Sequence, residues 1–251
     1  MTSHPELDKT IFLKSVDSTN RELKRRRREF QGSNVLVVSN AQSQGKGQKG
    51  RKWESAAGLG LWMSLYLGRM AVLDHNFQML SIYAGTVVHE ITSPLIPGKV
   101  YLKWPNDIMI NSKKCGGILT ELQWQGDAIV SAIIGIGINL SHGKDDFTPS
   151  IQSRATSLKL EGLKNPDRSI LIDAFVQSFF GNLSALDDGE QLAAEWNNKA
   201  YQMHQSVQWE SPQGNFEGRF SGINDRGDAL INIGGNLKAF QTGEIRLTES
   251  L

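Results

Sequence analysis

The sequence has few features that would tie it to a membrane or to an oxidising compartment. Its 251 residues include a single cysteine, Cys115, which cannot form an internal disulfide. No stretch approaches the roughly 18 apolar residues that a membrane-spanning helix needs, and the first residues lack the apolar core of a secretion signal. We therefore expect a cytoplasmic protein in which Cys115 is a buried small residue rather than a redox switch.

The chain also lacks an excess of charge of either sign. Lys and Arg total 27 against 26 for Asp and Glu, which gives a formal net charge of +1. This balance offers no electrostatic reason for binding DNA or a membrane surface, and we expect neither as a partner. The run Arg25–Arg28 is interpreted as a solvated helix face, because it is short and the whole chain is nearly neutral.

The hydrophobic pattern predicts an α+β domain, a mixed β-sheet with helices on one face. Hydrophobic residues make up 39% of the chain, which is enough to bury a core. The apolar spacing predicts strands at 11–16, 34–39, 59–67, 100–110, 116–123 and 128–138. It predicts helices at 20–30, 76–92, 169–186 and 191–200. A capping box from Thr19 to Glu22 should start the first helix.

The pattern of apolar and turn-forming residues changes after about Gln202. Short alternating apolar segments there are separated by Gly, Asn and Asp turn signals, as in Gly218–Ile223, Ala229–Ile233, Leu237–Phe240 and Ile245–Leu247. Short strands with tight turns predict a small antiparallel β-barrel. We therefore expect one domain over residues 1–200 and a second, all-β domain over residues 201–251.

A cationic, glycine-rich segment runs from Gly45 to Trp53, with the sequence GKGQKGRKW. Its glycines allow the backbone to fold around an anion, its four cations supply charge, and its tryptophan offers a stacking face. Neither a Walker loop nor a dinucleotide fingerprint matches the spacing. A disordered surface loop explains the composition equally well.

A second segment reads KWPND from Lys103 to Asp107 and is followed by Lys114 to Glu121. Pro105 should stop one strand, so that a return strand brings Asp107 and Lys114 to the same end of the sheet. A carboxylate there could hold Mg²⁺ on a nucleotide, and an ammonium could neutralise charge on a reacting carboxylate and phosphate. A surface ion pair at a hairpin is the simpler alternative.

The third segment, Ile133–Leu140, is an apolar strand interrupted by Gly135 and Gly137 and ending in Asn139. Glycine inside a strand often marks the close approach of a ligand or of another backbone. The amide at the strand end could contact a purine edge. Packing glycines in a buried strand would produce the same pattern.

Taken together and in order, these segments resemble the biotin–protein ligases. The matching pieces are Asp17–Asn20, Gln42–Trp53, Lys103–Asp107, Lys114–Glu121 and Gly135–Asn139. The resemblance is strong over residues 11–141 and looser to the end, where Thr242–Ile245 is similar to the family's SH3-like C-terminal barrel. Because it begins at Ile11, no winged helix-turn-helix is expected, and neither is a repressor role.

The resemblance implies roles for individual residues. The biotin pocket should include Ser18, Thr19, Gln42, Gly45, Lys46, Gln48, Lys114 and Gly117. The nucleotide should be bound by Lys46, Arg51, Trp53, Asn106 and Asn139. Lys114 and Asp107 should form the catalytic centre, with Asp107 holding Mg²⁺, whereas Lys103 and Trp104 should be mainly structural. Gly117, Gly135 and Gly137 should let the ligand approach the sheet.

The implied activity is the formation of biotinyl-5′-AMP from biotin and ATP, followed by transfer of biotin to a lysine of a biotin carboxyl carrier protein. The substrates would be biotin and ATP with Mg²⁺, and an exposed sheet edge could mediate a homodimer. The family usually has arginine where this chain has Lys46, and often where it has Gln48. We therefore expect the loop to hold the adenylate less tightly.

Three alternatives remain at this point. A lipoate–protein ligase shares the fold and the type of reaction, although KWPND and the Gly-Ile-Gly-Ile-Asn strand favour biotin. A pseudo-enzyme that only binds biotin is a non-catalytic alternative, against which the retention of Asp107 and Lys114 argues. An SH3-like interaction module would explain only the C-terminal part of the chain.

Overall fold

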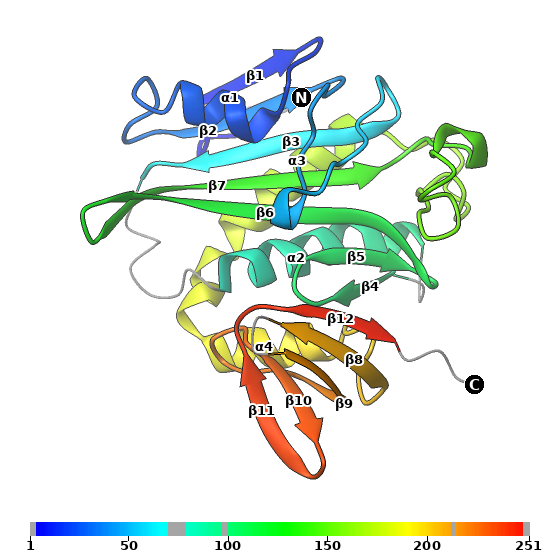
Figure 1. Ribbon diagram of the computed structural model, residues 1–251. Coiled ribbons are helices and arrows are strands. Elements are labelled where there is room, and N and C mark those ends of the chain that lie inside the picture. The colour runs from blue at the N-terminus through cyan, green and yellow to red at the C-terminus, as the bar shows by residue number, and fades with distance from the viewer. Residues whose placement is uncertain (1–3, 70–78, 97–99, 212–213, 248–251) are drawn as a thin grey trace.

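The chain forms two β-sheets joined by helices (Figure 1). The computed structural model describes residues 4–69, 79–96, 100–211 and 214–247. Within these ranges, no helix is long and apolar enough to cross a membrane. The expected helix start at residues 76–78 and Pro97 lie outside the described residues.

The larger sheet has seven strands in the order β1-β2-β3-β7-β6-β5-β4. The strands are β1 (Lys9–Leu13), β2 (Asn34–Ser39), β3 (Gly60–Leu67), β4 (Val100–Lys103), β5 (Asp107–Ile110), β6 (Lys113–Gln125) and β7 (Ala128–Asn139). The β1–β2 pair is parallel and the other pairs are antiparallel, so the expected mixed sheet is confirmed. The single strand expected at 100–110 is divided in two, because a turn at Trp104–Asn106 with a cis Trp104–Pro105 bond reverses the chain.

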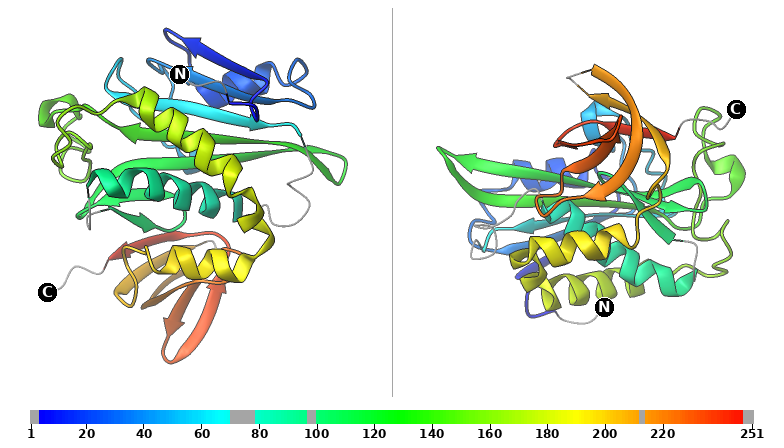
Figure 2. Two further views of the ribbon diagram at one scale, coloured as in Figure 1. Left: turned by 180° about the vertical axis from the view of Figure 1, so that it is seen from behind. Right: turned by 90° about the horizontal axis from the view of Figure 1, so that it is seen from below.

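The two long helices cover one face of this sheet. They are α2 (Met79–Thr92) and α3 (Arg168–Gly181), and the left view of Figure 2, from behind the molecule, shows them in front of the sheet. Side chains alternate across β2, so that Leu36 and Val38 join the core beneath these helices. Val35 and Val37 face the other way, where Leu23 of the short helix α1 (Thr19–Arg25) packs.

Both ends of α1 differ from the prediction. The N-cap is Ser18, so no capping box forms at Thr19, and the Thr19 side chain is free for other contacts. The helix ends at Arg25 rather than at Phe30. The arginines near this end form ion pairs with acidic residues. Arg25 contacts Asp17 and Glu22, as expected for a solvated, salt-bridged surface.

The helices α3 and α4 (Gly189–Asn197) are also shorter than predicted. The helix α3 ends at Gly181, and a 3-10 turn at Leu183–Asp187 replaces its expected last part. The helix α4 begins at the cap Asp188, whose carboxylate accepts a hydrogen bond from the Gln191 backbone N–H.

The smaller sheet is antiparallel and has the order β11-β10-β9-β8-β12. Its strands are β8 (Ser206–Ser211), β9 (Gly214–Ile223), β10 (Ala229–Ile233), β11 (Asn236–Phe240) and β12 (Glu244–Leu247). The sheet curls until Trp209 on β8 packs on Phe240 of β11, with ring centroids 4.7 Å apart. The small antiparallel β-structure is therefore confirmed, with edges at β11 and β12 that remain open within the described residues.

Trp104 joins the two sheets. Its indole packs on Trp209, with ring centroids 5.2 Å apart, and its Nε1 donates to the backbone oxygen of Gly227 at 2.9 Å. The side chain is buried. The expectation that Trp104 is structural agrees with this position between the sheets.

We expect Trp104→Ala to lower the free energy of unfolding by about 3–5 kcal/mol, because it leaves a cavity and unpairs the Gly227 carbonyl. Chemical denaturation followed by circular dichroism measures this. Trp124→Ala is the matched control: that side chain is 60% exposed, and its loss should cost about 0.5 kcal/mol. Equal costs for the two variants would contradict this interpretation of Trp104.

Candidate functional site

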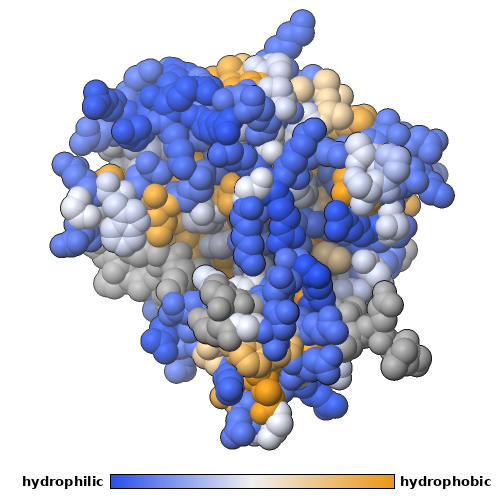
Figure 3. Space-filling model, viewed as in Figure 1, coloured by the Kyte–Doolittle hydropathy of each residue, from blue (hydrophilic) through white to orange (hydrophobic). Residues whose placement is uncertain are grey.

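A pocket of about 410 Å³ lies on the face of the large sheet opposite α2 and α3. Residues from α1, the glycine-rich loop, β5–β7 and β12 line it. Of the residues expected to form a site, it contains Ser18, Thr19, Gln42, Lys46, Gln48, Arg51, Trp53, Asn106, Asp107, Lys114, Gly117, Gly135, Gly137 and Asn139. Gly45 is not among its lining residues. The same face of the molecule is largely hydrophilic at its centre, with apolar residues gathered lower down over the smaller sheet (Figure 3).

The pocket floor owes its shape to the alternation in β7. Ile134, Ile136 and Ile138 belong to the core beneath the helices. Gly135 and Gly137 alternate with these isoleucines and therefore occupy the positions that face the pocket. Because they have no side chains, they leave space next to the sheet. The sequence pattern Gly-Ile-Gly-Ile-Asn thus encodes one packed face and one open face.

The glycine-rich loop is folded as a hairpin and crosses in front of β6 and β7 (Figure 1). At its base the Gln42 backbone N–H donates to the oxygen of Ser55, and the Trp53 N–H donates to the oxygen of Gly45. A Cβ at Gly45 would lie 2.4 Å from the Trp53 carbonyl oxygen, so the hairpin needs glycine there. Gly45 therefore shapes the loop without lining the pocket.

Trp53 fills the space in front of two of the expected ligand-approach glycines. A Cβ at Gly137 would lie 2.7 Å from the indole Nε1, and one at Gly117 would lie 3.5 Å from the ring. The Nε1 is buried and has no hydrogen-bond partner among the described residues. The Lys114 ammonium lies 5.2 Å from the ring centroid, within cation–π range.

Polar groups from α1 and the loop base meet at one end of the pocket. Gln42 Oε1 accepts from the Thr19 backbone N–H at 2.8 Å and lies 3.1 Å from the Thr19 hydroxyl. Gln42 Nε2 donates to Ser55 Oγ at 2.9 Å. Ser18 is buried, and its hydroxyl makes no capping bond to the helix. This end of the pocket is therefore a connected set of donors and acceptors.

Asp107 and Lys114 form an ion pair in the middle of the pocket. Asp107 begins β5, and Lys114 lies on β6 next to it, so the β5–β6 hairpin brings them together, with its turn at Asn111–Ser112 rather than at Asn106–Asp107. Asn106 fixes the turn, because its Nδ2 donates to the Ile118 backbone oxygen and its backbone oxygen accepts from the Ile118 N–H. The expected proximity of the carboxylate and the ammonium is thus present.

The Asn139 side chain is hydrogen-bonded to another segment of the same chain. Its Nδ2 donates to the Thr156 oxygen at 2.9 Å, and the side chain is buried. This bond uses one hydrogen of the amide nitrogen, which leaves the second hydrogen and the amide oxygen for a ligand. Cys115, on the adjacent strand β6, is fully buried, and burial raises the pKa of its thiol well above the ordinary value, as expected for an inert core cysteine.

The smaller sheet supplies one wall of the pocket, which the sequence did not indicate. Glu244 at the start of β12 pairs with Arg51 of the glycine-rich loop at 2.9 Å. Burial by itself would raise the pKa of Glu244, but Arg51 and Arg246 together hold it below its usual value. Burial lowers the pKa of the Lys103 ammonium group, although the carboxylates of Asp107 and Glu244 act in the opposite direction.

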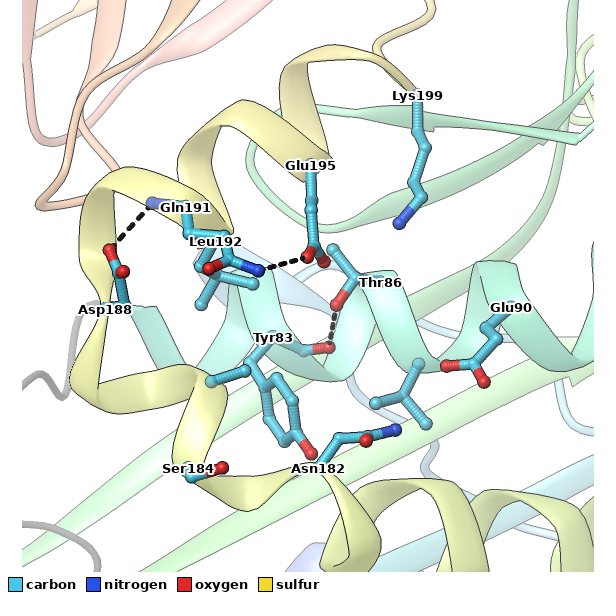
Figure 4. A pocket seen from close by; sticks show the side chains of 12 residues that line it. Tyr83, Thr86, Glu90, Asn182, Ser184, Asp188, Gln191, Leu192, Glu195 and Lys199 are labelled. Atoms are coloured by element: carbon cyan, nitrogen blue, oxygen red, sulfur yellow. Dashed lines mark hydrogen bonds between the residues drawn. The ribbon is translucent and has the colours of Figure 1, made fainter.

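A second hollow, of about 390 Å³, lies between α2, α4 and the 3-10 turn at Leu183–Asp187 (Figure 4). Some of its polar groups are bonded to one another: Asp188 accepts from the Gln191 backbone, and the Gln191 side chain donates to Glu195. Burial raises the pKa of the Tyr83 hydroxyl, which donates to the Phe179 oxygen. These contacts cap and pack helices, so the chemistry-bearing pocket is the one on the opposite face.

The comparisons with known proteins converge on one family. A profile of the biotin/lipoate A/B protein ligase family matches residues 12–139. A bifunctional ligase/repressor BirA from Bacillus spizizenii is 34% identical over 215 residues, which cover 85% of this chain and 66% of the relative. A biotin–[acetyl-CoA-carboxylase] ligase from Mycobacterium tuberculosis is 27% identical over 216 residues, covering 84% of this chain and 78% of the relative.

The structure is similar to a solved biotin protein ligase from Aquifex aeolicus in complex with biotin and ATP. The TM-score is 0.82 at 29% identity, and the match covers 97% of this chain and all of that one. The chain spans just under two thirds of the length of the Bacillus relative.

The pair between Glu244 and Arg51 gives a prediction about the loop. Glu244→Gln should speed tryptic cleavage within residues 46–52 by about two- to fivefold, because a partly exposed ion pair contributes roughly 0.5–1 kcal/mol. Glu210→Gln is the matched control. It removes an ion pair with Arg246, which lies on the same strand as Glu244, and it does not touch the loop. Cleavage at wild-type rate in both variants would show that Glu244 does not hold the loop.

Proposed function

The chain belongs to the biotin/lipoate A/B protein ligase family, and we propose that it is a biotin–protein ligase. In the proposed reaction, a biotin carboxylate oxygen attacks the α-phosphorus of ATP and pyrophosphate leaves. The amine of a lysine on a biotin carboxyl carrier protein then attacks the acyl carbon, an amide forms, and AMP leaves. The observation that carries the proposal is the Asp107–Lys114 pair in one pocket with the polar groups of Ser18, Thr19 and Gln42.

The polar end of the pocket suits the ureido ring of biotin. A urea has two N–H donors and one carbonyl acceptor, and it therefore needs both acceptors and donors from the protein. Ser18, Thr19 and Gln42 carry groups of both kinds. The backbone of the hairpin from Lys46 to Gln48, with Gly117 on the sheet, would complete the biotin site, and the Lys46 side chain would lie at its rim.

Lys114 would act at the reacting atoms. Its ammonium can hold the biotin carboxylate against the α-phosphate and neutralise the charge that develops during attack. Asp107 has one oxygen on Lys114 and one left over. Among the described residues, no three acidic, His or Cys side chains converge on one point. Mg²⁺, which usually takes one or two carboxylates plus phosphates and water, would therefore be held by Asp107 and by the nucleotide.

The nucleotide would lie towards the loop and the end of β7. Arg51 is placed to contact phosphate after exchanging its partner Glu244, and Asn139 offers an amide oxygen to adenine. Asn106 would support Asp107 through its bonds to Ile118. Trp53 now covers Gly117 and Gly137, so we propose that it moves from the sheet and closes over the bound adenylate, which excludes water from the mixed anhydride.

The alternative of a lipoate–protein ligase fits the pocket less well. Lipoate has no ureido group, so its dithiolane ring would leave buried polar groups of Thr19 and Gln42 without partners. A non-catalytic biotin-binding protein would not need the Asp107–Lys114 pair beside the pocket. We place the reaction in the cytoplasm, where the ATP and the carrier protein are available, and we propose the open edge of β1 as a site where a second copy could pair.

Biotin-dependent exchange between ATP and pyrophosphate tests the proposal. Lys114→Ala should lower the exchange rate by about 100-fold or more, because it removes the charge that the transition state needs. Lys113→Ala removes an adjacent, exposed lysine and should leave the rate within about twofold of wild type. Exchange with lipoate instead of biotin would favour the lipoate ligase, and a folded protein without exchange would favour the pseudo-enzyme.

A substitution at Gln48 tests how tightly the loop holds biotinyl-5′-AMP. Gln48→Arg should slow the release of biotinyl-5′-AMP by about tenfold, because it adds a charge-assisted hydrogen bond near the phosphate. Stopped-flow or filter-binding measurements of adenylate release check this. Gln208→Arg adds the same charge on the exposed face of β8 and should have no effect. Equal release from Gln48→Arg and wild type would refute the weak-loop prediction.

A further inference from the structure

A chain of hydrogen bonds runs beneath the polar end of the pocket and ends on a carboxylate of β6. Glu121 accepts from Lys24 Nζ at 2.7 Å through one oxygen and from Asn20 Nδ2 at 2.8 Å through the other. Ser64 Oγ lies 2.5 Å from Asn20 Oδ1 and 2.6 Å from Thr19 Oγ1. The chain therefore connects the surface pair of Lys24 and Glu121 to the pocket residue Thr19.

The carboxylate fixes which way the Asn20 amide faces. Glu121 Oε2 and the Leu119 backbone oxygen, at 2.8 and 3.4 Å, are both acceptors, so the group that faces them must be the NH₂. The Asn20 oxygen then faces Ser64. Asn20 is buried at 5% exposure and Ser64 is fully buried, so water does not compete for these contacts.

The amide direction decides the direction of the next two hydroxyl protons. Ser64 has one proton for two contacts, and the Asn20 oxygen can only accept, so that proton goes to Asn20. Thr19 Oγ1 lies 2.6 Å from Ser64 Oγ and 3.1 Å from Gln42 Oε1, and its one proton goes to the shorter contact, because the Ser64 proton is already used. Thr19 Oγ1 is left with lone pairs towards the pocket.

Gln42 is oriented independently by the backbone N–H of Thr19, which holds its Oε1. One Nε2 hydrogen goes to Ser55, and the other is left for the pocket. The pocket floor therefore presents an acceptor at Thr19 next to a donor at Gln42. A cyclic urea, with an N–H beside a C=O, matches this order.

Gly135 makes room for this arrangement. A Cβ at residue 135 would lie 2.3 Å from Asn20 Oδ1, closer than the contact allows. The sequence pattern assigned this glycine to ligand approach, and in the structure the space in front of it holds the Asn20 side chain. The strand β7 thus accommodates the buried amide that links Glu121 to the pocket.

We propose that Glu121 is a positioning residue for biotin, which acts through Asn20 and Ser64 to fix Thr19 as an acceptor for the ureido ring. The inference rests on the proposed function and deepens it, because it names the group that sets the hydrogen-bond pattern of the pocket. Glu121 itself does not touch the ligand. It selects a cyclic urea over groups with a different order of donors and acceptors.

The test is a two-residue exchange, with biotin affinity measured by calorimetry on the whole chain. Asn20→Asp places a second carboxylate against Glu121, and we expect biotin to bind about tenfold or more weakly. Adding Glu121→Gln restores the pair with its two members exchanged: the glutamine amide donates to the introduced aspartate, whose other oxygen still accepts from Ser64. We expect the double variant to bind within about threefold of wild type.

Two measurements separate positioning from general destabilisation. Lys24→Met removes the other partner of Glu121 at the surface and should leave biotin affinity within about twofold. In the exchange assay, Asn20→Asp should raise the KM for biotin while kcat at saturating biotin and the KM for ATP stay within about twofold. Thermal unfolding of each variant shows whether loss of affinity follows loss of fold.

The outcomes are distinct. Weak binding in Asn20→Asp with recovery in the double variant supports the inference. Wild-type affinity in Asn20→Asp, or a double variant that folds as wild type and binds no better than Asn20→Asp, overturns it while the ligase function stands. Absence of biotin binding by the wild-type chain overturns both the inference and the proposed function.

Discussion

The central constraint on this protein is that the second half of β7 must bury large side chains on one face and have almost none on the other. Ile134, Ile136 and Ile138 bury their side chains beneath α2 and α3. Gly135 and Gly137, between them, leave the opposite face open to Asn20 and Trp53. A β-strand can satisfy both demands because its side chains alternate, and a shift of one residue in register would put the isoleucines into the pocket.

The pocket is completed by segments that are far apart in the chain. Loop residues 45–53 fold over the open face, and Glu244 on β12 holds them through Arg51. Trp104 packs the smaller sheet against the larger one. The C-terminal sheet is therefore part of the site, and the proposed exchange of Glu244 for phosphate on Arg51 would link nucleotide binding to the contact between the two sheets.

The proposed chemistry divides the pocket into two regions with different physics. Around Asp107 and Lys114, charge is exposed enough to meet a nucleotide and a metal ion. Around Thr19, Ser64 and Asn20, neutral groups are buried and hydrogen-bonded to one another. In the proposed function, selectivity for a urea would come from the second region, because a buried donor or acceptor without a partner costs more than a matched one contributes.

Much of this was determined by the sequence, because local order in the chain carries it. The apolar runs of β2 and β7, the turn at Pro105 and the short segments after Gln202 predicted the sheets, and the ordered motifs identified most pocket-lining residues. Only the tertiary structure could place Glu244 beside Arg51, Asn20 in front of Gly135, and Trp53 over Gly117 and Gly137. Those contacts join residues that are distant in the chain, and no local pattern specifies which side chain fills a space that a glycine leaves.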